Sequence, residues 1–186
     1  DEVLSGKRVP GRRVAVIGAG GVGFDVAEYL SAPAEGDTLA HFLDAWGVDR
    51  SGAVAGGLVN PAPPRATREV TILQRKPAPA GKTLGLTTGW ALKAGLAQRG
   101  VRIVAGVRYV RIDDQGLHYL QEGKPALLEV DNVVLCTGQK SVRALYDELV
   151  ALGPPARLTL IGGAQRAAEL DALHAIEQGM RTALAM

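Results

Sequence analysis

The chain has 186 residues, of which 47% are hydrophobic and 22% charged, as expected of a globular domain with a buried core. Its 21 lysines and arginines are spread along the chain and leave a net charge of only +2, which argues against a nucleic-acid partner, and no apolar run approaches the roughly 20 residues that would span a membrane. A single cysteine excludes an internal disulfide and a cysteine-ligated cluster, and it favours a cytoplasmic location. The sequence starts at Asp1 without a signal peptide or an initiating Met, from which we expect a piece of a longer protein.

The first predicted elements are a lead-in over 1–11, a buried strand over 13–17 and a helix over 21–31. The turn between strand and helix reads Gly18-x-Gly20-x-x-Gly23. In a dinucleotide-binding unit the first glycine permits the tight turn, the second lets the backbone approach a pyrophosphate, and the third lets the helix pack closely on the sheet. A helix N-terminus favours phosphate, so we predict a nucleotide site here; a glycine-rich turn without a ligand is the alternative.

Two apolar patterns follow this turn. One helical face is predicted from the spacing of Val22, Val26, Ala27 and Leu30. Residues 32–68 are interpreted as an insertion, with a short amphipathic helix over 37–47, capped by Asp37 or Thr38, and a glycine- and proline-rich loop after it. The aromatic stripe of this helix is expected to pack rather than to bind a ligand.

The second strand is predicted over 69–76 and ends in Gln74, Arg75 and Lys76. This strand end selects between nicotinamide cofactors, because an acidic residue bonds the ribose 2′-hydroxyl of NAD whereas an arginine attracts the 2′-phosphate of NADP. With two cations and no acid, the sequence predicts NADP(H). The alternative is a pair of exposed, solvated cations.

A helix over 90–99, with Thr88 as its cap, and a strand over 101–104 come next. Trp90 faces either a ligand or the core, and the core is the preferred interpretation. An antiparallel hairpin is predicted over 107–112 and 117–120, with a third strand over 127–130. These elements predict an α/β fold, a Rossmann-like parallel sheet with an antiparallel hairpin layer.

The last buried strand of this part is predicted over 133–136 and contains Cys136, which we interpret as a small buried hydrophobe. A short helix over 141–151, a strand over 158–161 and a helix to the C-terminus complete the chain. That last helix has one apolar face, formed by Leu170, Leu173, Ile176, Met180 and Leu184.

Several stretches together carry a family resemblance: VAVIGAGGVGFDVAEYL, FLDAWGVD, LQRK, TTGW, VDNVVLCTGQ and LIGGAQRAAELDALHAIEQG. They resemble the C-terminal part of bacterial NADPH-dependent 2,4-dienoyl-CoA reductases, old-yellow-enzyme-like flavoproteins related to trimethylamine dehydrogenase. The resemblance implies a parent whose N-terminal TIM barrel carries FMN, a 4Fe–4S cluster and the dienoyl-CoA site. It also implies an FAD domain into which an NADPH domain is inserted, so that residues 12–138 bind NADPH and 139–186 form part of an incomplete FAD domain.

The resemblance also implies site residues by position. The pyrophosphate site is Gly18, Ala19, Gly20, Gly21, Val22 and Gly23. Arg75 and Lys76, beside Gln74, take the 2′-phosphate, and Trp90 lies near the nicotinamide. Thr137 and Gly138 form the turn where the chain leaves the domain, and the part facing FAD comprises Gly163, Leu170, Asp171 and Ala172. Gln165 stands where the family commonly has an acidic residue, which departs from the FAD pattern.

The implied function is NADPH binding and hydride transfer to FAD for the reduction of 2,4-dienoyl-CoA thioesters in unsaturated fatty acid β-oxidation. No catalytic residue is expected in this part, and the piece alone is not expected to turn over substrate. The alternatives are a non-catalytic NADP(H)-sensing module and an NAD-linked relative resembling trimethylamine dehydrogenase. The apolar face of the helix over 166–184 is expected to pack on the NADPH domain or on a second copy, giving a dimer.

Overall fold

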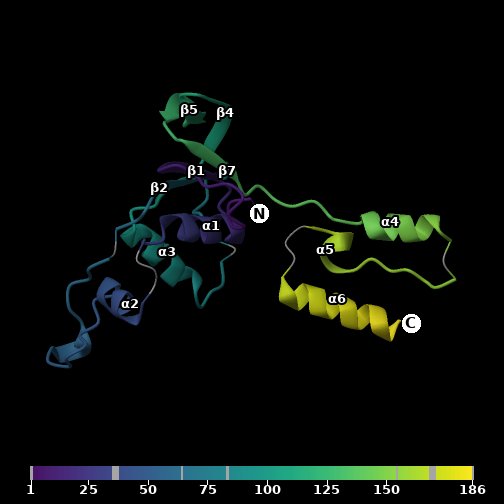
Figure 1. Cartoon of the computed structure of the whole chain (residues 1–186), viewed down its shortest axis with the longest axis horizontal. Coiled ribbons are helices and arrows are strands. Elements are labelled where there is room, and N and C mark those ends of the chain that lie inside the picture. Colours follow the sequence, from purple (N-terminus) through teal and green to yellow (C-terminus); the bar gives the residue numbers. More distant parts are fainter. Residues whose placement is uncertain are drawn as a thin grey trace. The chain divides into compact units, whose positions relative to one another are not determined.

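The structure, a computed structural model, describes residues 2–34, 38–63, 65–82, 84–153, 155–167 and 171–185. The chain divides into two units, Asp1–Cys136 and Thr137–Met186 (Figure 1).

A four-stranded parallel sheet forms the centre of the first unit, in the order β3-β2-β1-β7. The strands are β1 (Arg13–Ile17), β2 (Glu69–Leu73), β3 (Arg102–Val104) and β7 (Asn132–Leu135). Because β1 carries only apolar residues after Arg13 and lies between two neighbours, its side chains at positions 14–17 are all buried. The strand predicted over 133–136 forms one residue earlier, as β7, so Cys136 lies immediately after it.

Alternate residues of β1 point to opposite faces, and each face is covered by a different layer (Figure 1). Val14 and Val16 pack into a core shared with the helices α1 (Gly21–Ser31) and α3 (Gly89–Gln98). Ala15 and Ile17 pack into a second core that includes residues of the antiparallel sheet. The predicted α/β fold with an antiparallel layer is confirmed.

The buried face of α1 differs in one position from the prediction. Val26, Ala27 and Leu30 are buried as expected, but Val22 is 53% exposed and Phe24 is completely buried instead. Val22 lies in the first turn of the helix and is exposed there, which helical spacing alone did not predict.

The antiparallel sheet consists of β4 (Val107–Asp113), β5 (Gly116–Gln121) and β6 (Lys124–Leu128) in sequential order. Its third strand lies earlier than the predicted range of 127–130, because a tight turn at positions 122–123 brings Lys124 opposite Gln121.

The insertion contains α2 (Leu39–Ala45) and a single 3-10 turn, η1 (Ala55–Gly57). Thr38 caps α2 by accepting a hydrogen bond from the His41 N–H at 3.2 Å, whereas the alternative cap, Asp37, lies outside the described residues. An isolated bridge between Val48 and Leu58 closes the loop that follows the helix.

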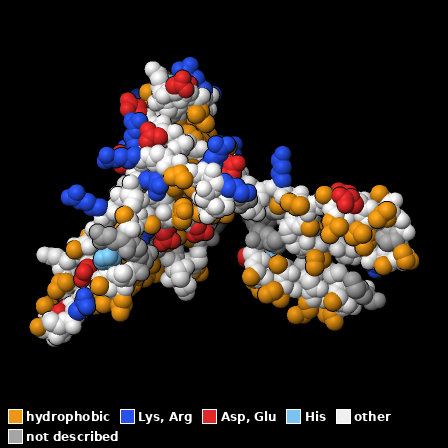
Figure 2. All heavy atoms as spheres, viewed as in Figure 1, with side chains coloured by type: hydrophobic (Ala, Val, Ile, Leu, Met, Phe, Trp, Pro, Cys, Tyr) orange, Lys and Arg blue, Asp and Glu red, His pale blue; other side chains and the backbone are white. Residues whose placement is uncertain are grey.

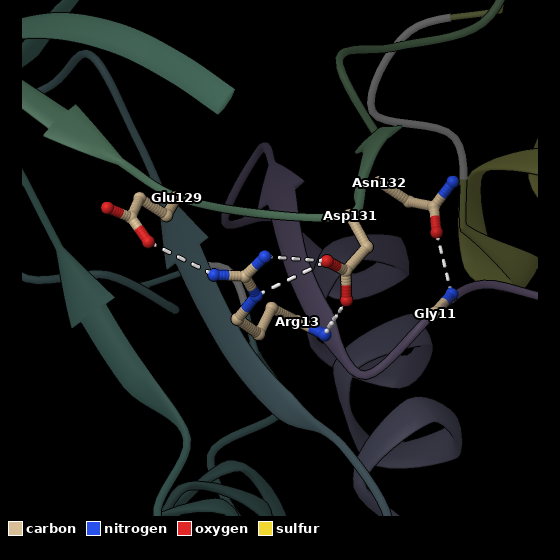
Figure 3. Close-up of polar contacts among 5 residues, drawn as sticks. All are labelled: Gly11, Arg13, Glu129, Asp131 and Asn132. Atoms are coloured by element: carbon tan, nitrogen blue, oxygen red, sulfur yellow. Dashed lines mark hydrogen bonds and ion pairs between the residues drawn. The ribbon is translucent and has the colours of Figure 1, made fainter. Parts of the chain in front are cut away.

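Polar contacts tie the beginnings of β1 and β7 together (Figure 3). The Asp131 carboxylate accepts hydrogen bonds from the Arg13 backbone N–H at 2.8 Å and from its guanidinium at 2.9 Å, and the same guanidinium contacts Glu129 at 3.1 Å. The Gly11 N–H donates to the Asn132 side chain at 2.7 Å. These contacts fix the edge of the sheet at which the strands begin, opposite the edge at which the glycine turn lies.

The second unit contains three helices among its described residues, α4 (Ala144–Ala151), α5 (Gly162–Gln165) and α6 (Ala172–Leu184). The strand predicted over 158–161 is wrong, since these residues pair with no strand that the structure describes. The C-terminal helix predicted over 166–184 forms as α6, which begins later, at Ala172, and the preceding glycines form the separate single turn α5. Asp171 caps α6 by accepting from the His174 N–H at 2.8 Å.

Apolar side chains remain at the surface of this unit (Figure 2). The exposed face of α6 comprises Leu173, Ile176, Met180 and Leu184. Leu170, predicted to share that face, lies outside the described residues. Within the described part of the chain, no helix is both long enough and apolar enough to cross a membrane.

Candidate functional site

The glycine turn lies at the carboxyl edge of the parallel sheet, where β1 meets α1. Gly18 has a φ of +116°, and a Cβ there would lie 2.2 Å from the Cys136 carbonyl oxygen. A Cβ on Gly23 would lie 1.9 Å from the Gly18 carbonyl oxygen. These two glycines are therefore required by the close approach of backbones, which lets α1 start directly on the strand end.

Gly20 and Gly21 are different, because a Cβ on either would meet no atom within 4 Å. Gly20 is the N-cap of α1, no side chain caps this helix, and its first turn contains no acidic residue. The backbone N–H groups of the first turn thus have no capping side chain and lie at the positive end of the helix dipole. Such an arrangement suits a diphosphate, which accepts hydrogen bonds and carries negative charge.

The end of β2 lies beside this turn, since the Gly18 N–H donates to the Leu73 carbonyl at 2.9 Å. The strand ends at Leu73, earlier than the predicted residue 76, and Gln74, Arg75 and Lys76 form the start of the next loop. Arg75 and Lys76 are exposed, and among the described residues no carboxylate forms an ion pair with either. The structure thus brings the glycine turn and the two cations to neighbouring strand ends.

Gln74 lies in the same loop but turns its side chain back onto the protein. Its amide nitrogen donates to the Lys76 carbonyl at 2.8 Å and also to the Ala78 carbonyl.

Trp90 lies in the first turn of α3 and is 65% exposed, so the prediction that it belongs to the core is wrong. Its ring nitrogen donates to the Thr87 carbonyl at 3.0 Å. Its ring meets Trp46 of the insertion edge-on, with centroids 6.2 Å apart, and Trp46 in turn contacts Phe42 at 6.3 Å. Thr88 occupies the N-cap position as predicted, but its side chain makes no capping hydrogen bond.

Cys136 lies next to the glycine turn and is partly buried. Burial raises the pKa of its thiol, which disfavours the reactive thiolate. No group of three or more metal-binding side chains occurs among the residues that the structure describes.

The residues assigned to the exit turn of the nucleotide domain and those assigned to the flavin side lie in the second unit. Thr137 and Gly138 are its first two residues and are exposed. Gly163 lies in the single turn α5, Asp171 and Ala172 are the cap and first residue of α6, and Leu170 lies outside the described residues. The Asp171 carboxylate also accepts from the His174 ring at 2.6 Å, and these hydrogen bonds lower the pKa of Asp171.

Sequence reasoning missed one group that shapes the site. The Tyr109 hydroxyl of β4 donates to the Leu73 carbonyl at 3.0 Å, and burial raises the pKa of this phenol while the charge of nearby Arg75 lowers it. No local pattern reveals this contact, because the two residues are 36 positions apart.

Three solved structures share the fold of this chain. A 2-naphthoyl-CoA reductase matches 100% of it at 19% identity with a TM-score of 0.70. A histamine dehydrogenase from Rhizobium sp. 4-9 matches 98% at 16% identity and a TM-score of 0.66, and a 6-hydroxypseudooxynicotine amine oxidase from Pseudomonas geniculata N1 matches 97% at 20% identity and 0.68. The chain spans 23%, 24% and 23% of the lengths of these three proteins, in the same order.

A family model, described as pyridine nucleotide-disulphide oxidoreductase, matches residues 1–159. This range contains the parallel sheet, the glycine turn, the strand-end cations and the antiparallel sheet. The chain therefore belongs to the pyridine nucleotide-disulphide oxidoreductase family.

Proposed function

We propose that this chain is the NADPH-binding portion of a flavoprotein oxidoreductase related to the 2,4-dienoyl-CoA reductases. The observation that carries the proposal is the pairing of two features at adjacent strand ends. An open glycine turn with an uncapped helix follows β1, and two exposed cations without acidic partners among the described residues follow β2.

The two features have separate tasks in holding the nucleotide. The turn at Gly18–Gly23, with Ala19 and Val22 between its glycines, would offer backbone N–H groups to the pyrophosphate. Arg75 and Lys76 would attract the 2′-phosphate that distinguishes NADPH from NADH. When bound, NADPH supplies a hydride, and this chain's own contribution is to bind and orient it. Trp90, at the exposed start of α3, is proposed to lie near the nicotinamide.

The flavin part of the proposal concerns the second unit. Residues 158–161 pair with no described strand, and the carboxylate of Asp171 already caps α6. The assignment of Gly163, Leu170, Asp171 and Ala172 to a flavin face rests on the family resemblance. So does the role of Thr137 and Gly138 as the turn where the chain leaves the nucleotide domain. The same resemblance supports a dienoyl-CoA thioester as substrate, and FMN and a 4Fe–4S cluster in parts of the parent beyond this chain.

A second candidate is a non-catalytic NADP(H)-sensing module. The two candidates share the nucleotide site and differ in hydride transfer, so supplying a flavin partner separates them: a sensor would bind NADPH without transferring its hydride to the flavin.

Calorimetric titration of the protein with NADPH and, separately, with NADH tests the proposal. We expect NADPH to bind at least tenfold more tightly, a difference of about 1.4 kcal/mol. Arg75→Ala should remove most of this preference, whereas Arg108→Ala, which removes an exposed cation of β4 outside the strand-end loop, should retain it. Equal binding of NADH and NADPH would contradict the assignment of the cations and favour an NAD-linked relative.

A further inference from the structure

We propose that Gln74 is a positioning residue that sets the preference for NADPH by holding the loop that carries Arg75 and Lys76. The inference rests on the proposed function, because it concerns how the same site selects its nucleotide. It also revises the expectation that Gln74 itself contacts the cofactor.

The hydrogen bonds of the Gln74 side chain explain why it acts on the loop. Both partners, the carbonyls of Lys76 and Ala78, are acceptors, so the atom facing them must be the amide nitrogen. An amide nitrogen has two N–H groups, and both are used here. What remains is a carbonyl oxygen, which accepts hydrogen bonds and does not attract a phosphate. Gln74 therefore has no donor left for the nucleotide.

The loop is held from a second side by the segment between β3 and β4. The Gln74 N–H donates to the Val104 carbonyl at 2.9 Å, and the Val107 N–H donates to the Gln74 carbonyl at 3.1 Å. The Gly106 N–H donates to the Lys76 carbonyl at 3.1 Å, so this carbonyl accepts from both sides of the loop. Main-chain bonds thus anchor the beginning of the loop, and the Gln74 side chain closes it around Arg75 and Lys76.

Closing the loop matters because the two cations have long, exposed side chains. A flexible backbone would add to the conformational freedom that must be lost when a phosphate is bound. A loop already closed around its own amide presents both cations in one arrangement. The effect acts only on ligands that carry the 2′-phosphate, so it changes selectivity more than general nucleotide affinity.

The test is a double-mutant cycle measured by titration with NADPH and NADH. Gln74→Met keeps the length of the side chain and removes both donors. We expect it to lower the NADPH preference about fivefold, the size of one or two net hydrogen bonds, with NADH affinity unchanged. Gln121→Met, at the exposed end of β5, is the matched control and should leave both affinities unchanged. In a background carrying Arg75→Ala and Lys76→Ala, Gln74→Met should have no further effect, because it acts through these residues.

Each outcome of the cycle has a distinct meaning. If the unmodified protein shows no NADPH preference, the proposed function fails. If it shows the preference and Gln74→Met retains it, the positioning role alone is wrong. If Gln74→Met lowers the NADPH preference equally in the background carrying Arg75→Ala and Lys76→Ala, Gln74 contacts the nucleotide directly. This result also overturns the inference. Should Gln74→Met fail to fold, Gln74→Asn keeps the amide but ends one carbon short of the two carbonyls, and it should produce the same loss.

Discussion

Replacing Gly23 by alanine should separate the packing role of the glycine turn from its binding role. Gly23 is buried, and an added Cβ would lie 1.9 Å from the Gly18 carbonyl oxygen. An ordinary contact begins near 3.4 Å, so the helix or the turn would have to move by about 1.5 Å. The turn does not move easily, because the Gly18 N–H is hydrogen-bonded to the Leu73 carbonyl and Gly18 lies close against the Cys136 carbonyl.

The expected cost follows from this geometry. Overpacking a close-packed site costs about 1–3 kcal/mol, and the better helix propensity of alanine offsets at most about 1 kcal/mol. Because the atom that the added Cβ meets is a backbone carbonyl oxygen rather than the end of a flexible side chain, we expect the upper part of the range for Gly23→Ala, about 2–3 kcal/mol of unfolding free energy. For a chain of 186 residues this corresponds to a fall in Tm of about 4–12 °C.

Urea unfolding followed by circular dichroism measures this loss. Gly21→Ala is the matched control, because it makes the same change two residues earlier in the same helix, where a Cβ meets nothing within 4 Å. The control should have the stability of the unmodified protein or up to about 1 kcal/mol more. If Gly23→Ala is as stable as Gly21→Ala, the close approach of the two backbones is not what requires a glycine here.

Three further changes probe the core, the ligand space and the sheet edge. Phe24→Ala removes a completely buried ring and should cost about 3–5 kcal/mol in urea unfolding, and a loss below 1 kcal/mol would mean that this core is not formed as described. Gly20→Ala fills open space beside the uncapped helix, so NADPH affinity should fall about tenfold, with at most about 1 kcal/mol lost in stability because alanine is a poorer N-cap than glycine. Unchanged affinity in calorimetry would place the pyrophosphate elsewhere. Hydrogen bonds from Arg13 lower the pKa of Asp131, so this carboxylate stabilises the fold above the ordinary carboxyl pKa of about 4, and its contribution disappears as the pH falls through the lowered value. Asp131→Asn should therefore be less stable at neutral pH and lose less on acidification, and identical pH profiles would exclude this role.

The parallel sheet and the glycine turn were predictable because their causes are local. An uninterrupted apolar run such as 14–17 must be buried on both faces, and the glycine spacing defines where the following helix begins. The position of Arg75 and Lys76 after β2 was equally predictable, because the order of the elements places the end of this strand beside the glycine turn.

The errors concern residues whose structure depends on distant partners. Leu158–Ile161 has the composition of a strand but pairs with none among the described residues, and a strand without a partner leaves its backbone groups unpaired. Trp90 was assigned to the core by its apolar character, yet its ring packs at the surface against Trp46 of the insertion. Side-chain type alone does not reveal such a contact.

The positioning of the candidate site was also beyond sequence reasoning. Gln74 was predicted to contact the ligand because of its place beside Arg75, and the hydrogen bonds of its side chain to the Lys76 and Ala78 carbonyls could not be predicted from the sequence. Gly106 supports this loop and Tyr109 supports the strand end before it, from positions 30 residues or more along the chain, and no periodicity in the sequence indicates these contacts.

The most direct measurement for the central claim is an NMR titration of the isotope-labelled protein with NADPH, following the backbone amides. The proposal predicts that the largest shifts occur at two places, the amides of Gly20–Gly23 and those of Arg75 and Lys76, and that NADH shifts the first group while affecting the second far less. Shifts that leave the glycine turn unchanged and appear only in the second unit would contradict the claim that this turn binds the nucleotide.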